Sequence, residues 1–183
     1  MKTRLAADIG PSAACRAYLA MARRVRDSVA ELKGARVVWV YDPSPAHPGL
    51  AWLGKPSGEV WRQSKGDLGR RLAGGFARAF AEGAREACAI GVDTPDLASA
   101  ALRQAFAVLA RRELVLGPSA DGGYYLIGLR RFCPELFQRI SWSTSRVLAQ
   151  TRSRAARLHL RLGTLSEGHD VDTAADLVRW LRS

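Results

Sequence analysis

Cysteine, histidine and long apolar runs are scarce in this sequence. The three cysteines, Cys15, Cys88 and Cys133, are odd in number, far apart and free of any Cys-x-x-Cys pair, which argues against a disulfide framework and a zinc knuckle. No apolar run approaches the roughly 20 residues that cross a bilayer, and none of signal-peptide length follows the polar N-terminus at residues 1–8. We therefore expect a cytoplasmic protein with no membrane span.

The sequence also lacks the residue sets that mark a nucleophile or a histidine metal site. His47, His159 and His169 do not have the spacing of metal ligands. Serine, cysteine and histidine form no arrangement typical of covalent catalysis. These absences argue against a covalent hydrolase.

Acidic residues are few beside the basic ones. The chain has 17 Asp and Glu against 28 Lys and Arg, a formal net charge of +11, and dense positive charge is one signature of nucleic-acid binding. The arginine pairs at 23–24, 70–71, 111–112 and 130–131 are scattered, however, and no aromatic residues are interleaved with them. The pattern favours a solvated basic surface without a nucleic-acid partner, and it is compatible with a small polyphosphate substrate.

Hydrophobic periodicity alternates between helix and strand along the chain. Apolar spacings of three and four predict helices, and short continuous apolar runs predict buried strands. The expected order is helix 11–32, strand 35–41, helix 66–82, strand 87–92, helix 97–112, strands 114–116 and 124–129, helix 145–157, strand 158–165 and a closing helix that ends at 181. This alternation predicts one α/β domain over residues 1–183, with a mainly parallel, doubly wound sheet that binds its ligand beyond the carboxyl ends of the strands.

Carboxylates stand at two places where such a sheet would meet a ligand. Asp93 ends the run 87–92, and a carboxylate there suits a hard divalent cation such as Mg²⁺ or Mn²⁺. The alternative is a helix cap before Thr94 and Pro95. The turn Asp170-Val171-Asp172-Thr173 has the same two interpretations, because its carboxylates can bind a metal and Thr173 can cap the next helix.

A glycine pair marks a third candidate, in the stretch 117–125. Gly122 and Gly123 allow positive φ and close approach of the backbone to a ligand, and Tyr124 can present a flat apolar face to a sugar or base. A plain turn would explain the glycine pair as well.

The loop 63–71 is a fourth candidate. It places Gly66, Asp67 and Arg70 at the start of a helix, where free N–H groups and the helix dipole favour phosphate. The alternative is that Asp67 only caps this helix.

The order of these segments resembles a known family. The matching segments are 2–6, 66–71, 91–97, 117–128, 142–144 and 170–173, and the most specific is Gly117-Pro118-x-x-Asp121-Gly122-Gly123-Tyr124-Tyr125. They resemble the bacterial glycosyltransferase-A-like proteins known as arsenosugar-biosynthesis-type glycosyltransferases. More distantly, they are similar to 2-phospholactate and molybdenum-cofactor guanylyltransferases. These proteins share the nucleotide-diphospho-sugar transferase fold, which the resemblance implies for nearly the whole chain.

The resemblance also implies roles for single residues. Asp93 stands where these folds hold metal and diphosphate, Asp172 would be the second carboxylate, and Lys2 and Arg4 would face phosphate. In these folds the segment that starts at Lys2 follows a first β-strand and a glycine-containing loop. We therefore expect the domain to be N-terminally truncated, or to complete its sheet by association, as in a homodimer.

These features predict a metal-dependent glycosyltransferase that uses a nucleotide-diphosphate sugar and a small-molecule acceptor. Asp93 and Asp121 would act in catalysis, and residues 122–124 would contact substrate. Mg²⁺ or Mn²⁺, held by Asp93 and Asp172, would stabilise negative charge on the leaving group. Two alternatives stay open: nucleotidyl transfer from a nucleoside triphosphate, and a non-catalytic remnant or binding module.

Overall fold

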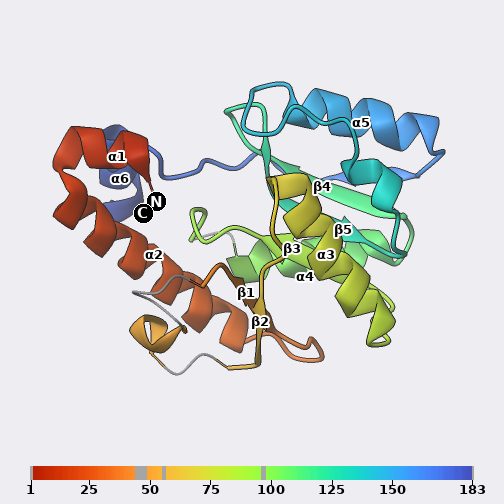
Figure 1. Ribbon diagram of the computed structural model, residues 1–183, viewed down its shortest axis with the longest axis horizontal. Coiled ribbons are helices and arrows are strands. Elements are labelled where there is room, and N and C mark those ends of the chain that lie inside the picture. The colour runs from red at the N-terminus through yellow and green to blue at the C-terminus, as the bar shows by residue number, and fades with distance from the viewer. Residues whose placement is uncertain (1, 44–48, 55–56, 96–97, 183) are drawn as a thin grey trace.

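The structure is a computed structural model that describes residues 2–43, 49–54, 57–95 and 98–182 (Figure 1). His47 and residues 96–97, where the sequence predicts the start of a helix, lie outside these ranges. The helices are α1 (Thr3–Ile9), α2 (Pro11–Ala30), α3 (Leu68–Ala81), α4 (Ala98–Leu109), α5 (Val147–Arg157) and α6 (Ala174–Leu181), with short 3-10 helices η1 (Ala51–Leu53) and η2 (Pro134–Phe137). The strands are β1 (Val38–Tyr41), β2 (Glu59–Arg62), β3 (Ala87–Ile90), β4 (Leu114–Pro118), β5 (Tyr124–Leu129) and β6 (Leu162–Thr164).

Four strands form the main sheet, in the order β3-β5-β4-β6. β5 runs antiparallel to both β3 and β4, while β6 is parallel to β4. Only residues 119–123 connect β4 to β5, and so short a connection allows a hairpin but no parallel crossover. Since β3, β4 and β6 point in one direction, their carboxyl ends meet at one edge of the sheet. The predicted α/β class is confirmed, with β5 as the antiparallel strand.

β1 and β2 form a separate, parallel two-stranded sheet. Within the described residues, β1 pairs with β2 alone and β3 pairs with β5 alone, so each keeps one edge without a strand partner. Trp39 of β1 and Ile90 of β3 nevertheless pack against the same apolar core. The expected additional strand and the homodimer stay predictions.

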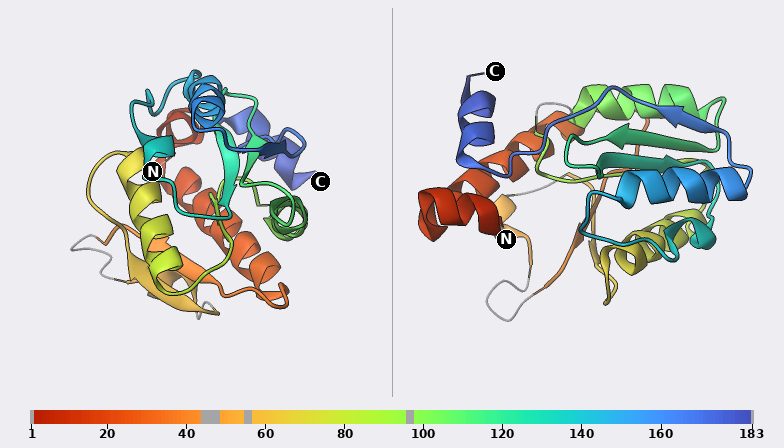
Figure 2. Two further views of the ribbon diagram at one scale, coloured as in Figure 1. Left: turned by 90° about the vertical axis from the view of Figure 1, so that its right-hand side faces the viewer. Right: turned by 90° about the horizontal axis from the view of Figure 1, so that it is seen from above.

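The main sheet is covered on both faces by helices (Figure 2). Side chains of a strand alternate between the two faces, so Val115 and Leu126 pack with residues of α2 and α4, whereas Leu116 and Ile127 pack with residues of α3, η2 and α5. All four side chains are buried. This explains the continuous apolar runs that predict β4 and β5, because both faces of these two strands are covered.

The two ends of the chain pack together at one end of α2, beside the sheet (Figure 1). The buried Leu5 of α1 shares a small core with Ala14 and Ala17 of α2 and with Leu177 of α6. The Asp8 carboxylate accepts a hydrogen bond from the backbone N–H of Ala174, 2.9 Å away. The polar start of the sequence is thus a short helix tied to the last helix. No helix in the described ranges is long and apolar enough to cross a membrane.

Candidate functional site

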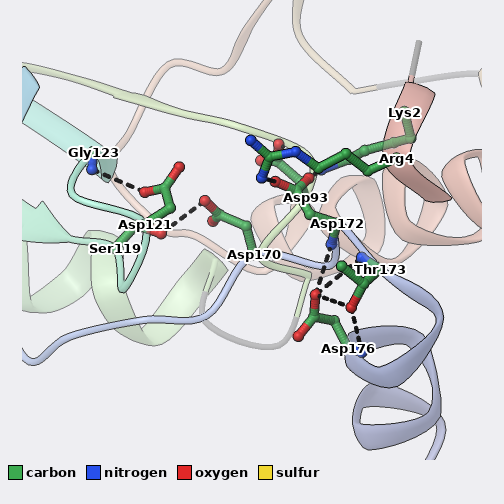
Figure 3. A network of polar contacts seen from close by, with 10 residues as sticks. All are labelled: Lys2, Arg4, Asp93, Ser119, Asp121, Gly123, Asp170, Asp172, Thr173 and Asp176. Carbon is green, nitrogen blue, oxygen red and sulfur yellow. Dashed lines mark hydrogen bonds and ion pairs between the residues drawn. The ribbon is translucent and has the colours of Figure 1, made fainter. Parts of the chain in front are cut away.

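Polar side chains gather where β3, β4 and β6 end (Figure 3). Asp93 follows β3, Ser119 and Asp121 follow β4, and Asp170 and Asp172 follow β6. Three strands that end at one edge of the sheet therefore deliver these side chains to one place, which is where open α/β sheets bind ligands.

Backbone hydrogen bonds hold the three loops in position. The N–H of Gly168 donates to the carbonyl of Pro118 at 2.8 Å, and the N–H of Ala120 donates to the carbonyl of Gly168 at 3.3 Å. Three residues further on, the N–H of Val171 donates to the carbonyl of Asp93 at 3.0 Å. The segment 168–172 thus runs between the loop after β3 and the loop after β4, so Asp170 and Asp172 are placed by main-chain contacts.

Lys2 stands at the centre of the site. Its Nζ donates to Asp93 Oδ2 at 3.0 Å and to Asp172 Oδ1 at 2.6 Å. Only 11% of the Lys2 side chain is exposed, against 36% for Asp93 and 32% for Asp172. Burial alone would lower the pKa of Lys2, but the charges of Asp93 and Asp172 and the hydrogen bonds to them outweigh it, and the pKa is raised. Lys2 is therefore a protonated cation shared by two carboxylates.

Helix α1 brings two cations to the site. Lys2 precedes its first turn, and Arg4 lies within it. Arg4 is 74% exposed, and its Nη1 is 3.9 Å from Asp172 Oδ2. Because Leu5 and Asp8 anchor α1 to α6, the position of both cations depends on contacts between the two ends of the chain.

Asp170 is a more buried carboxylate beside this pair. Its Oδ2 accepts a hydrogen bond from the Ser119 hydroxyl at 2.7 Å, and its Oδ1 is buried without a hydrogen-bond donor among the described residues. Burial raises the pKa of Asp170 to about 6; the nearby charges of Asp93 and Asp121 add to the rise, and the Ser119 hydrogen bond opposes it. The sequence placed Asp170 in the acidic turn, but nothing in it indicated the partner Ser119.

The capping interpretation of the acidic turn is confirmed, while metal binding there stays a prediction. The Thr173 hydroxyl accepts from the backbone N–H of Asp176, and Asp176 Oδ2 accepts from the backbone N–H of Thr173, which together form a capping box at the start of α6. Since Thr173 caps the helix, Asp172 is free to face Lys2.

Asp121 lies at the rim, in the turn between β4 and β5. Its Oδ1 accepts a hydrogen bond from the backbone N–H of Gly123 at 2.8 Å, and its side chain is exposed. Gly122 has φ +85°, and a Cβ there would overlap the carbonyl of Ser145. The Gly122 carbonyl also accepts from the N–H of Leu148 at 2.9 Å. Gly122 thus lets the turn lie against residues 145–148, at the start of α5.

Two predicted groups lie apart from the carboxylates. Tyr124 packs edge-on against Trp142, with ring centroids 6.5 Å apart, and burial raises the pKa of its hydroxyl far above the usual range. At the start of α3, Asp67 Oδ1 caps the helix by accepting from the N–H of Arg70 at 2.8 Å, and the carbonyl of Gly66 accepts from Arg71 Nε. Among the described residues, no ion pair or hydrogen bond links these two groups to the carboxylates of the site. Their roles in binding stay predictions.

Tyr18 of α2 is a site residue that sequence reasoning missed. Burial raises the pKa of its hydroxyl, and the charge of nearby Asp93 raises it further. Its ring lies 6.2 Å from that of Trp52. In the sequence, Tyr18 is one member of an apolar helical stripe, so its periodicity predicts only a core position.

A cavity of about 250 Å³ opens beside the cluster. Its wall includes the guanidinium of Arg4, the hydroxyls of Ser119 and Thr173, the imidazole of His169 and the carboxylates of Asp121, Asp170, Asp172 and Asp176. The geometry offers a small polar ligand both anionic and cationic partners within one concave site.

Comparison with known proteins identifies the family of this chain. Residues 25–144 match the family described as "Uncharacterized protein conserved in bacteria (DUF2064)". No curated protein of known function matches the chain. A crystal structure from Desulfovibrio desulfuricans G20, of a protein named as a "putative nucleotide-diphospho-sugar transferase", is 33% identical with a TM-score of 0.92, and the match covers 100% of this chain and 80% of that one.

Two more distant structures share the fold. Rv0371c from Mycobacterium tuberculosis H37Rv is 19% identical with a TM-score of 0.60, covering 89% of this chain and 84% of that one. CMP:2-keto-3-deoxy-manno-octonic acid synthetase, complexed with CTP, is 14% identical with a TM-score of 0.58, covering 88% of this chain and 87% of that one. The arsenosugar-type assignment and the N-terminal truncation are not addressed by these matches. The chain has the nucleotide-diphospho-sugar transferase fold and belongs to the DUF2064 family of bacterial proteins.

Proposed function

We propose that this chain is a metal-dependent glycosyltransferase that transfers a sugar from a nucleotide-diphosphate sugar to a small-molecule acceptor. The observation that best supports this function is the meeting of Asp93 and Asp172 with Lys2 and Arg4 at one edge of the sheet. Carboxylates there can bind a divalent cation, and the ammonium and guanidinium groups can bind phosphate oxygens. A nucleotide-diphosphate sugar is a substrate class that brings diphosphate and cation together.

The fold implies a divalent cation, and the carboxylate oxygens at the site suit a hard one. Asp93 and Asp172 offer hard oxygen ligands, which Mg²⁺ and Mn²⁺ prefer. Within the described ranges, no group of three or more His, Cys, Asp or Glu side chains is arranged to hold a metal ion by itself. Mg²⁺ is commonly held by one or two carboxylates together with substrate phosphates, so these two residues fit a cation that the diphosphate shares. Such a cation would stabilise negative charge on the leaving nucleoside diphosphate.

The other residues at the site would bind and orient the substrates. The exposed guanidinium of Arg4 can reach phosphate oxygens in a paired geometry. Asp121 stands at the cavity wall, where its carboxylate can accept a hydrogen bond from a sugar or acceptor hydroxyl. Together they would fix the sugar and the acceptor relative to each other, which is how an enzyme turns a bimolecular step into an effectively unimolecular one.

Binding of nucleotides tests the site directly. We would titrate the protein calorimetrically with a panel of nucleoside diphosphates and nucleotide-diphosphate sugars, with and without Mn²⁺. Asp93→Asn should abolish the manganese dependence while circular dichroism stays native. The matched control is Asp27→Asn, which removes an exposed carboxylate of α2 that pairs, among the described residues, with the adjacent Arg26. Unchanged metal-dependent affinity in a folded Asp93→Asn protein would overturn the assignment.

The products distinguish the proposed reaction from its rivals. With a nucleotide-diphosphate sugar, glycosyl transfer releases nucleoside diphosphate. With a nucleoside triphosphate and a phosphorylated acceptor, nucleotidyl transfer releases pyrophosphate from the same kind of site. Tight binding of either substrate without turnover in the presence of acceptors would instead indicate a binding module.

A further inference from the structure

We infer that Lys2 is an exchangeable counter-ion of the carboxylate site: it occupies the cation position in the free protein and gives it up to a divalent metal when a nucleoside diphosphate binds. This inference rests on the proposed function for the identity of the metal and of the nucleotide. It adds that the two bind in a coupled way, because the metal and the diphosphate must then bind together.

The geometry places the ammonium where the metal would be. Asp93 Oδ2 and Asp172 Oδ1 both accept from the single Nζ atom of Lys2, at 3.0 and 2.6 Å. A cation that bound these same two oxygens would have to lie between them, in the space that Nζ fills. An ammonium and a divalent cation repel each other strongly at such short range, so the two cannot share the position.

The remaining oxygens of the pair do not offer a second position of the same kind. Asp172 Oδ2 faces the guanidinium of Arg4 at 3.9 Å. Asp93 Oδ1 folds back over Gly91, so close that a Cβ on Gly91 would overlap it. The two carboxylates therefore converge on one point, and Lys2 holds it.

Lys2 can leave without disturbing the fold. It precedes the first turn of α1, and the helix is anchored by Leu5 and Asp8 further along. Its charge sits on a flexible four-carbon stem that can swing about its own bonds. What it needs is another anion, because a partly buried ammonium without a partner is costly. The phosphates of a bound nucleotide would supply that anion on the same side of the site as Arg4, while the metal takes over the carboxylates.

Manganese binding in the absence of nucleotide tests this exchange. Lys2→Met keeps most of the apolar stem and removes the charge. We expect the full-length Lys2→Met protein to bind Mn²⁺ alone about tenfold more tightly than the wild type, a ratio that corresponds to about 1.4 kcal/mol. Electron paramagnetic resonance of free Mn²⁺ during a titration measures this affinity without any turnover.

Two further variants separate exchange from a general charge effect. Lys2→Arg keeps a cation in place and should leave the affinity for Mn²⁺ close to that of the wild type. Arg4→Met removes a cation from the first turn of α1, two residues after Lys2 and not between the carboxylates. It should change the affinity much less than Lys2→Met. Equal or weaker Mn²⁺ binding by a folded Lys2→Met protein would overturn the inference, as would an equal gain from Arg4→Met.

The nucleotide titration gives a second, separable readout. In the wild type, a nucleoside diphosphate should raise the affinity for Mn²⁺, and Mn²⁺ should raise the affinity for the nucleotide by the same factor. In Lys2→Met this mutual gain should shrink, because no ammonium has to move. If Lys2→Met binds Mn²⁺ more tightly but no nucleotide binds to either protein, the displacement of Lys2 by metal holds and the proposed function fails.

Discussion

The Asp93 carboxylate lies directly over Gly91, with Oδ1 in the space that a Cβ at position 91 would fill. The absence of a side chain at residue 91 is therefore part of the geometry of the site. The new Cβ would meet the end of the Asp93 side chain rather than backbone atoms, and Gly91 does not have a positive φ. A larger residue should redirect Asp93 rather than unfold the loop.

Gly91→Ala should separate the position of Asp93 from the stability of the fold. We expect a native melting temperature together with a roughly tenfold loss of metal-dependent nucleotide affinity, since misplaced catalytic or ligand groups are costly even at small displacements. Calorimetry and thermal melts measure the two effects. Gly75→Ala in α3 is the matched control: nothing lies within 4 Å of the new methyl group, and replacing a helical glycine should stabilise by about 1 kcal/mol. Full affinity in Gly91→Ala would show that the carboxylate finds another path to its ligand.

Gly122→Ala should act on stability instead. Gly122 has φ +85°, and its new Cβ would overlap backbone atoms of Ser145, which cannot turn aside. We expect a loss of about 2–4 kcal/mol in the free energy of unfolding, measured in urea. Gly83→Ala is the control, because Gly83 has a similar φ of +90° but nothing within 4 Å, and it should cost only about 1 kcal/mol. Equal losses in the two variants would mean that the turn does not press against α5.

The ion pair between Glu113 and Arg161 predicts an acid-sensitive contribution to stability. Arg161 Nη2 lies 2.6 Å from Glu113 Oε1, and the hydrogen bonds from the Arg161 side chain and backbone lower the pKa of Glu113 to about 2. In the unfolded chain this pKa returns to 4.5. The stabilisation is therefore complete above the unfolded pKa and is lost as the pH falls from about 4.5 to about 2.

Glu113→Gln tests this contribution through the pH dependence of urea denaturation. The variant should be less stable than the wild type at pH 7, and the difference should disappear as the pH approaches the folded-state pKa of about 2. The pair joins the start of β4 to the start of β6. A difference in the free energy of unfolding that stays constant at every pH would point to packing rather than to charge as its cause.

The three cysteines should differ sharply in reactivity. Cys15 is exposed, whereas Cys133 is buried and Cys88 is partly buried. Burial, with a smaller contribution from Glu86, raises the pKa of Cys88 to about 12, and burial also raises the pKa of Cys133. Since the thiolate is the reactive form, a maleimide at pH 8 should label Cys15 first, as peptide mass spectrometry would show. Rapid labelling of Cys88 in the native protein would contradict the packing of β3 against the core.

The sequence alone determined the alternation of elements and several of the site residues. Continuous apolar runs at 87–92 and 114–116 predict strands covered on both faces, and the structure places β3 in the first and β4 in the second. β4 is fully buried, whereas β3 is half-buried. Asp93 could be recognised because a residue that follows a buried strand is delivered to one edge of the sheet. Thr173 and Asp67 could be recognised as caps because capping is a local interaction between residues three positions apart.

Only the tertiary structure decided how distant residues meet. The Lys2–Asp172 pair spans 170 positions, and no local pattern specifies a contact over that separation. Tyr18 has the periodicity of a core residue, and only the packing of α2 brings it near Asp93. Conversely, the sequence of the Gly122-Gly123 pair and Tyr124 fits a binding loop as well as a turn. In the structure, residues 145–148 contact Gly122, and the ring of Trp142 packs against Tyr124. Periodicity and caps report interactions between near neighbours, whereas the site is built by segments that touch only after the chain has folded.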